Sequence, residues 1–127
     1  MRKYKLIIIM SLLILLVVGC SRGSYTVVKG SEFNTPTKMS MTYYKFTGYK
    51  ETNVTVKEGQ PVVVTFDIVT EEGTLNAYIA KNNDKSNCSY EGKDIPTSNF
   101  TVTLTEKGKY TIRLDAQKHS GSYSITW

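Results

Sequence analysis

From residue 39 onward, hydrophobic and polar residues alternate along the chain in short runs. This two-residue period is typical of β-strands with one face buried and one face in water. In residues 61–70, for example, Val62, Val64, Phe66 and Ile68 share one face, which we expect to be the core face. The predicted strands cover residues 39–46, 53–57, 61–70, 74–80, 100–104, 110–114 and 123–127. No part of this region keeps the 3.6-residue spacing of an amphipathic helix.

Glycine-containing turn sequences separate the predicted strands, at Gly59, Gly73, Gly108 and Gly121. Glycine adopts backbone angles that other residues reach only with strain, so it commonly marks turns. The last of these sequences places the chain's single histidine, His119, in a solvent-exposed hairpin turn. Short strands with one polar face each predict an all-β fold, a single antiparallel β-sandwich of about seven to eight strands with jelly-roll-like character.

A different pattern opens the chain. Three basic residues lie within the first five positions, and an uncharged apolar run follows over residues 6–18. This order is typical of a secretory signal. A bilayer core of about 30 Å needs about 20 apolar residues, so a short run disfavours a permanent transmembrane helix. An uncleaved membrane anchor is the alternative.

The apolar run ends in Val17, Val18, Gly19 and Cys20. This tetrapeptide resembles the lipobox of bacterial prolipoproteins, whose cysteine thiol accepts a diacylglycerol group before the chain is cut in front of it. The resemblance implies that residues 1–19 are a signal peptide. It also implies that Cys20 carries lipid, including palmitate-like acyl chains, and holds the protein on the extracytoplasmic face of a bacterial cell membrane. A buried structural cysteine is the alternative.

The rest of the chain divides into two predicted parts. Residues 20–37 are rich in Ser, Gly and Thr and contain Pro36, so we expect a flexible tether with one short strand-like island. Residues 38–127 form the predicted domain. Without the signal, 13 basic residues remain against 11 acidic ones, with no basic cluster suited to phosphates. Nucleic acid is therefore not an expected partner.

The strand motifs of the last 75 residues carry a second resemblance. They include the sequence GKYTI at residues 108–112 and GSYSITW at residues 121–127. Such repeated Gly-x-Tyr strands resemble the small jelly-roll-type sandwiches of bacterial lipoproteins and of pre-peptidase C-terminal domains in secreted enzymes. These domains are mostly accessory, so the resemblance implies an architecture without an active site.

Catalytic chemistry has few candidates. Cys88 is the only cysteine after Cys20, so no disulfide can form within the domain. If successive strands alternate in direction, one end of the sandwich gathers a group of polar residues: Asp84, Cys88, Asp94, Lys118 and His119. A Cys–His pair also needs direct contact and a third orienting group, which spacing does not supply. We predict a domain that is not an enzyme.

Metal and cofactor sites are likewise not expected. The loop at residues 82–87 offers oxygen ligands but lacks the glycine and glutamate spacing of an EF-hand. One histidine and one free cysteine do not suffice for a closed zinc site. The only predicted non-protein group is the covalent diacylglycerol on Cys20.

The chain contains nine tyrosines, which offer ring surface and a hydroxyl for sugars or protein partners. Alternation places Tyr110 and Tyr123 in the core, and it leaves Tyr43 or Tyr44, Tyr49, Tyr78 and Tyr90 as candidates for exposure. We name Tyr78, Tyr90, Asp84 and His119 as possible ligand-binding residues. The main functional hypothesis is a non-enzymatic binding or structural module at the cell envelope, for a protein or a cell-wall polymer. The alternative is a carbohydrate-binding module for cell-wall or host glycans.

Overall fold

The computed structural model describes residues 22–127, and these residues form seven β-strands. The predicted signal peptide, the lipobox and Cys20 lie outside the described residues. Within the described part of the chain, no helix is long and apolar enough to cross a membrane.

All seven strands belong to one antiparallel sheet, in the order β1-β3-β7-β4-β5, with β2 also paired to β3 and β6 also paired to β4. The strands are β1 Tyr25–Thr26, β2 Lys29–Thr35, β3 Lys38–Val56, β4 Val62–Lys81, β5 Cys88–Gly92, β6 Ser98–Leu104 and β7 Gly108–Thr126. The predicted all-β antiparallel sandwich is confirmed.

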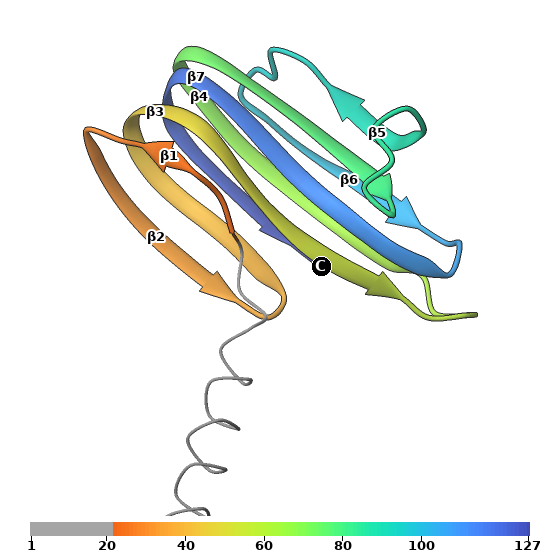
Figure 1. The fold of residues 1–127 in the computed structure, drawn as a ribbon. Helices are drawn as coiled ribbons and strands as arrows, with labels where there is room; N and C mark the ends of the chain where they lie inside the picture. The colour runs from red at the N-terminus through yellow and green to blue at the C-terminus, as the bar shows by residue number, and fades with distance from the viewer. Residues whose placement is uncertain (1–21) are drawn as a thin grey trace, which may run out of the picture.

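The three longest strands, β3, β4 and β7, each bend near the middle and contribute to both layers of the sandwich (Figure 1). Each therefore contains two of the predicted strands. The pairing register shifts where they bend, around residues 43–48 of β3 and 70–74 of β4. Such β-bulges add a residue on one side of a pair and so bend and twist the strand. We call this bent region, with residues 117–121 of β7, the hinge.

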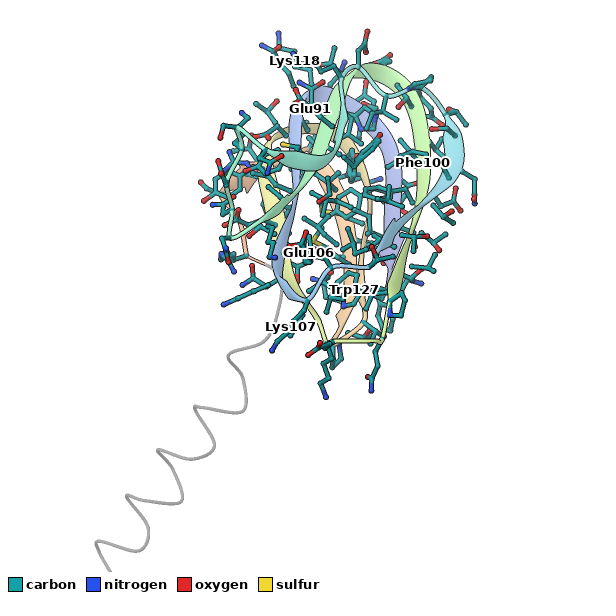
Figure 2. All side chains as sticks on the ribbon, turned by 90° about the vertical axis from the view of Figure 1, so that its right-hand side faces the viewer. Glu91, Phe100, Glu106, Lys107, Lys118 and Trp127 are labelled. Carbon is teal, nitrogen blue, oxygen red and sulfur yellow. The ribbon has the colours of Figure 1, made fainter. Side chains whose placement is uncertain are left out.

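Two layers result. The first layer contains β2, β6 and residues 38–43, 62–70 and 121–126 of the long strands. The second layer contains β1, β5 and residues 48–56, 74–81 and 108–116. Figure 2 places Phe100 and Glu91 on opposite layers, Lys118 at the hinge end, and Glu106 and Lys107 at the other end.

The hydrophobic core fills the space between the layers. Val64, Phe66 and Ile68 have no exposed surface, so the predicted core face of residues 61–70 is confirmed. The inward residues of the other long-strand segments belong to the same cluster, among them Leu75, Ile79, Ile112, Leu114, Tyr123 and Ile125. Burial of this continuous apolar surface is the main force that holds the two layers together.

The predicted hairpin turn at residues 119–121 is wrong, because β7 continues through it as part of the hinge. Gly121 has φ of 140°, and a Cβ atom on it would lie 2.0 Å from the carbonyl oxygen of Val69 on β4. The glycine is therefore required by close approach of two backbones rather than by a reversal of the chain.

The segment expected to be a tether belongs to the sheet from Arg22 onward. Arg22 forms a β-bridge with Glu51, and β1 and β2 pair with β3 on the same edge of the two layers. Lys50, in the second layer, forms an ion pair with Glu32 on β2, in the first. This contact joins the layers along the edge, and both side chains are shielded from solvent, Lys50 almost completely.

The stretch between the predicted strands at residues 74–80 and 100–104 also contains a strand. β5 pairs with the end of β4, and Ile95, which follows it, is buried in the core. The amide of Ile95 donates a 2.8 Å hydrogen bond to the carbonyl of Leu75, which fixes the crossing from one layer to the other.

Candidate functional site

The outer face of the second layer carries a row of polar and aromatic side chains across its strands. In the strand register, Tyr78 on β4 lies between Glu91 on β5 and Arg113 on β7. Arg113 in turn lies opposite Glu51 on β3. Directly opposed residues on one face of an antiparallel sheet are near neighbours, so these four strands present one continuous row.

A second row lies beside the first. It contains Asn76 on β4, Asp115 on β7 and Tyr49 on β3, again in direct register. The two rows are joined through Arg113, whose guanidinium carbon lies 4.1 Å from the centroid of the Tyr49 ring. Arg113 also donates hydrogen bonds of 2.9 and 3.1 Å to the carboxylate of Asp115. We call the two rows together the polar platform.

These contacts fix the charges on the polar platform. The hydrogen bonds that Arg113 donates to Asp115 raise the pKa of Arg113, which keeps the guanidinium charged. Its stacking on Tyr49 and its bonds to Asp115 hold the plane of the guanidinium in one orientation. A partner therefore meets donors and acceptors that are already in place.

A hollow of about 160 Å³ lies on the polar platform beside Tyr78. It is lined by Asn76, Ala77, Tyr78, Lys85, Glu91, Gly92, Lys93 and Asp115. The Lys85 ammonium lies 5.5 Å from the centroid of the Tyr78 ring, and the Tyr78 hydroxyl donates a 3.1 Å hydrogen bond to Asn83. Burial raises the pKa of Tyr78, so its hydroxyl stays protonated.

The expectation that Tyr78 points freely into solvent is therefore wrong. Only 7% of its surface is exposed, because the turn that contains Asn83 and Lys85 lies against it. Lys85 itself is exposed, and its ammonium group lies over the face of the Tyr78 ring.

Glu51 has an unusual environment for a residue on an outer face. It is 8% exposed, and one carboxylate oxygen accepts a 2.8 Å hydrogen bond from Nε of Arg22. The other oxygen, Oε2, is buried without a hydrogen-bond partner. A buried acceptor without a partner costs free energy, so this oxygen favours any donor that reaches it.

His119 is not part of the polar platform and is not exposed as predicted. It has no exposed surface and lies in the hinge. Nδ1 lies 2.5 Å from the hydroxyl of Tyr43, and Nε2 lies 2.8 Å from the hydroxyl of Thr70. Burial lowers the pKa of His119, so the neutral imidazole is favoured.

The predicted gathering of Asp84 and Cys88 with His119 does not occur. The turn that contains Asp84 begins beside Lys109, where Asn82 donates a 2.8 Å hydrogen bond to the carbonyl of Lys109. Lys109 lies near the start of β7, whereas His119 lies in the hinge, near the middle of that strand. Asp84 is exposed, and its carboxylate accepts hydrogen bonds within the turn from Ser86.

Cys88 has a free thiol that donates a 3.2 Å hydrogen bond to the carbonyl of Lys85. Desolvation raises the pKa of this thiol, which disfavours the nucleophilic thiolate. Within residues 22–127, no group of three or more His, Cys, Asp or Glu side chains is arranged to hold a metal ion.

Tyr90 was expected to be exposed, but it is half-buried between the layers. Its ring packs against Phe66 and Phe100, with centroid distances of 5.6 and 5.3 Å. Of the four residues predicted to bind a ligand, only Tyr78 lies on the polar platform. The other platform residues were missed, although Arg113 and Asn76 occupy the outward positions of predicted strands.

The chain is similar to solved structures, but no protein family is identified for it. No protein-family model and no curated protein matches the chain. The solved structures that are similar to it include three carbohydrate-binding modules. A CBM4 structure has a TM-score of 0.48 and 13% identity, over 82% of this chain and 75% of that one.

The second is the low-affinity xylan-binding module CBM86 of Roseburia intestinalis, with a TM-score of 0.45 and 9% identity over 84% of this chain and 89% of that one. The third is TmCBM61 in complex with β-1,4-galactotriose, with a TM-score of 0.46 and 12% identity over 84% and 83%. None of these three is a pre-peptidase C-terminal domain. With every TM-score below 0.5, these likenesses carry no argument about the ligand of this chain.

Proposed function

We propose that this protein is a non-catalytic glycan-binding module that is held at the extracytoplasmic face of a bacterial membrane by lipid on Cys20. The observation that carries the glycan part is the polar platform. It combines an aromatic ring at a shallow hollow with charged and amide groups that both donate and accept hydrogen bonds.

Sugars present apolar C–H faces together with many hydroxyl groups. Tyrosine rings provide surface for the apolar faces, and carboxylate, amide and guanidinium groups each bond hydroxyls. On the polar platform Asn76, Glu91 and Asp115 surround the hollow beside Tyr78. Because these groups stand on paired strands, little conformational freedom is lost when a ligand binds.

Glycan arrays followed by titration calorimetry test the proposal, using a chain without residues 1–20, which keeps all seven strands. Glu91→Ala and Asp115→Ala each remove an acceptor from the hollow, and we expect each to weaken binding about tenfold, which corresponds to about 1.4 kcal/mol. Asp67→Ala is the matched control, because Asp67 is an exposed carboxylate on the outer face of the first layer, opposite Ser124.

No retention of any cell-wall or host glycan, or equal loss in the Asp67→Ala control, contradicts a glycan site on the polar platform. Specific capture of a protein on this face, abolished by Asp115→Ala, supports instead a module for a protein partner. That outcome retains a binding function and changes its ligand.

The membrane part of the proposal is supported by the sequence that precedes Arg22, in which an apolar run ends at Gly19-Cys20. Intact mass spectrometry of the processed protein tests it. We expect a chain that begins at Cys20 and carries the added mass of a diacylglycerol group, and we expect Cys20→Ser to leave the precursor unmodified and uncut. An unmodified chain that begins downstream of Cys20 contradicts lipid anchoring.

A further inference from the structure

Three large hydrophobic side chains are exposed along the β2 edge of the first layer. The exposed fractions are 69% for Val28, 63% for Phe33 and 47% for Tyr44. Val28 lies beside Tyr44, since its amide donates a 2.9 Å hydrogen bond to the Tyr44 carbonyl. Phe33 lies opposite Ser40 and Tyr44 opposite Lys29, in the pairing of β2 with β3. We call these three residues the apolar edge patch.

Lysine side chains surround the apolar edge patch. The Lys38 ammonium lies 5.8 Å from the centroid of the Phe33 ring, and the Lys45 ammonium lies 5.2 Å from the centroid of the Tyr44 ring. Lys45 also pairs with Glu72, whereas Lys29 and Lys38 form no ion pair with the described residues. A hollow of about 350 Å³ with mainly apolar walls lies between Lys29 and Tyr44.

Exposed aromatic and aliphatic groups ringed by lysines match the chemistry of an anionic bilayer surface. The rings and Val28 can enter the boundary between headgroups and acyl chains, while lysine ammonium groups remain among the lipid phosphates. The walls of this hollow contain no carboxylate, which an anionic surface would repel.

The position of the patch in the chain points to the same surface. The described chain enters the domain at Arg22, which pairs with Glu51 in the second layer, and β1 and β2 then follow β3 along this same edge of the two layers. Cys20 precedes Arg22 by only two residues, a reach of about 7 Å when fully extended. A lipid on Cys20 would therefore hold this edge at the membrane, with no long spacer between them.

We propose that the apolar edge patch docks on an anionic phospholipid bilayer and sets the orientation of the domain on the membrane. This inference rests on the lipid anchoring in the proposed function. It also extends that function, because the patch lies on the outer face of the first layer and the polar platform on the outer face of the second. Docking through this edge leaves the polar platform uncovered.

Depth-dependent fluorescence quenching tests the orientation in the full-length lipidated protein on vesicles that contain anionic phospholipid. Trp127→Phe first removes the only tryptophan of the chain. In that background, Phe33→Trp places a reporter in the patch. Val63→Trp is the matched control, because Val63 is 50% exposed and lies on the first layer opposite Thr103 of β6, away from the patch.

We expect brominated acyl chains to quench the tryptophan at position 33 at least about threefold more than the tryptophan at position 63. We also expect the double substitution Tyr44→Ser and Val28→Ser to reduce quenching at position 33 while the protein still floats with the vesicles. Equal quenching at positions 33 and 63 in floating protein overturns the docking and leaves the anchoring intact.

Failure of the lipidated protein to float with vesicles overturns the anchoring and, with it, the docking. A blue-shifted tryptophan emission at position 33 without lipid, together with a dimer mass in light scattering, assigns the patch to contact between two copies and also overturns the docking.

Discussion

His119 and Tyr43 meet inside the hinge, where Nδ1 of the imidazole lies 2.5 Å from the tyrosine hydroxyl. The hydrogen bonds of Thr70 determine which group donates in the bond between His119 and Tyr43. The hydroxyl of Thr70 donates a 2.8 Å hydrogen bond to the carbonyl of Ile95, so it accepts from Nε2–H of His119. Nδ1 is then the acceptor, and the Tyr43 hydroxyl donates to it. This chain of bonds joins β3, β7 and β4 to the segment after β5.

Acid is expected to weaken this chain of bonds. Burial lowers the pKa of His119 in the folded protein, whereas in the unfolded chain it lies near the ordinary value of about 6.5. As pH falls below about 6.5, the unfolded chain therefore binds a proton that the folded chain resists, and stability decreases until the pH falls below the folded pKa. Above about pH 7 this contribution is constant.

Urea unfolding at a series of pH values measures the effect. We expect the unfolding free energy of the wild type to fall between pH 7 and pH 5 more than that of His119→Gln, which has no titrating ring. Parallel pH dependence in the two proteins contradicts the assignment to His119.

Removing the Tyr43 hydroxyl isolates the bond itself. Tyr43→Phe keeps the ring, which packs against Phe46 at a centroid distance of 4.9 Å, but leaves Nδ1 of His119 buried without a donor. We expect a loss of about 1–3 kcal/mol in unfolding free energy, measured by chemical denaturation. Tyr44→Phe is the matched control on the next residue, which is exposed, and we expect a change within about 0.5 kcal/mol. Glycan binding at the polar platform should be unchanged in both variants.

The buried histidine in the hinge shows where the alternation pattern fails to predict the structure. Alternation along the chain predicted correctly that Tyr110 and Tyr123 face inward. The sequence His119-Ser120-Gly121 indicated a reversal of the chain, because glycine with positive φ serves both hairpin turns and bulges. A bulge is distinguished from a hairpin turn here only because β7 pairs with β3 and β4 on both sides of the hinge. That pairing joins residues far apart in the sequence, so a local pattern does not reveal it.

The polar platform could be predicted only in part, because alternation along one strand says nothing about which strands lie beside it. The outward positions of residues 74–80 follow from alternation, and Tyr78 was named among them. Its partners Arg113 and Glu51 come from strands distant in sequence, and the register that brings them opposite each other depends on the fold. The burial of Tyr78 depends on the turn at Asn83, which alternation does not describe.

β1 was predicted only as a short strand-like island within a tether, and β2 was missed, because the sequence of this segment is polar and carries little alternation. Their stability comes from pairing with β3 and from contacts across the layers. Tyr25 packs edge-on against Phe46 at 5.5 Å, and Lys50 reaches Glu32. A chain that begins at residue 37 would expose the β3 edge and leave the largely buried Lys50 without its partner.

We therefore expect the fragment of residues 37–127 to be less stable than the fragment of residues 21–127 by more than about 3 kcal/mol, since an uncompensated buried charge alone costs about that much. Thermal unfolding followed by circular dichroism compares the two. Glu32→Gln in the longer fragment separates the ion pair from strand pairing, and we expect it to show only part of the loss. Equal melting temperatures for the two fragments would mean that β1 and β2 contribute nothing to the fold.

Gly121 gives the strictest test of the bent sheet. A methyl group at this position would lie 2.0 Å from the Val69 carbonyl oxygen, and its φ of 140° is strained for any other residue. The atoms that this methyl group would meet are the backbone carbonyl oxygen and carbon of Val69 on β4, which pairs with β7. The clash can therefore be relieved only by separating β4 from β7. We expect Gly121→Ala to cost more than about 3 kcal/mol, or to prevent folding. Gly59→Ala is the control: Gly59 also has positive φ, of 69°, but a Cβ atom there meets nothing within 4 Å, so a loss of only about 1 kcal/mol is expected. If the two variants lose equal stability in denaturant unfolding, strain alone accounts for the effect, and the close contact of β4 and β7 at the hinge is wrong.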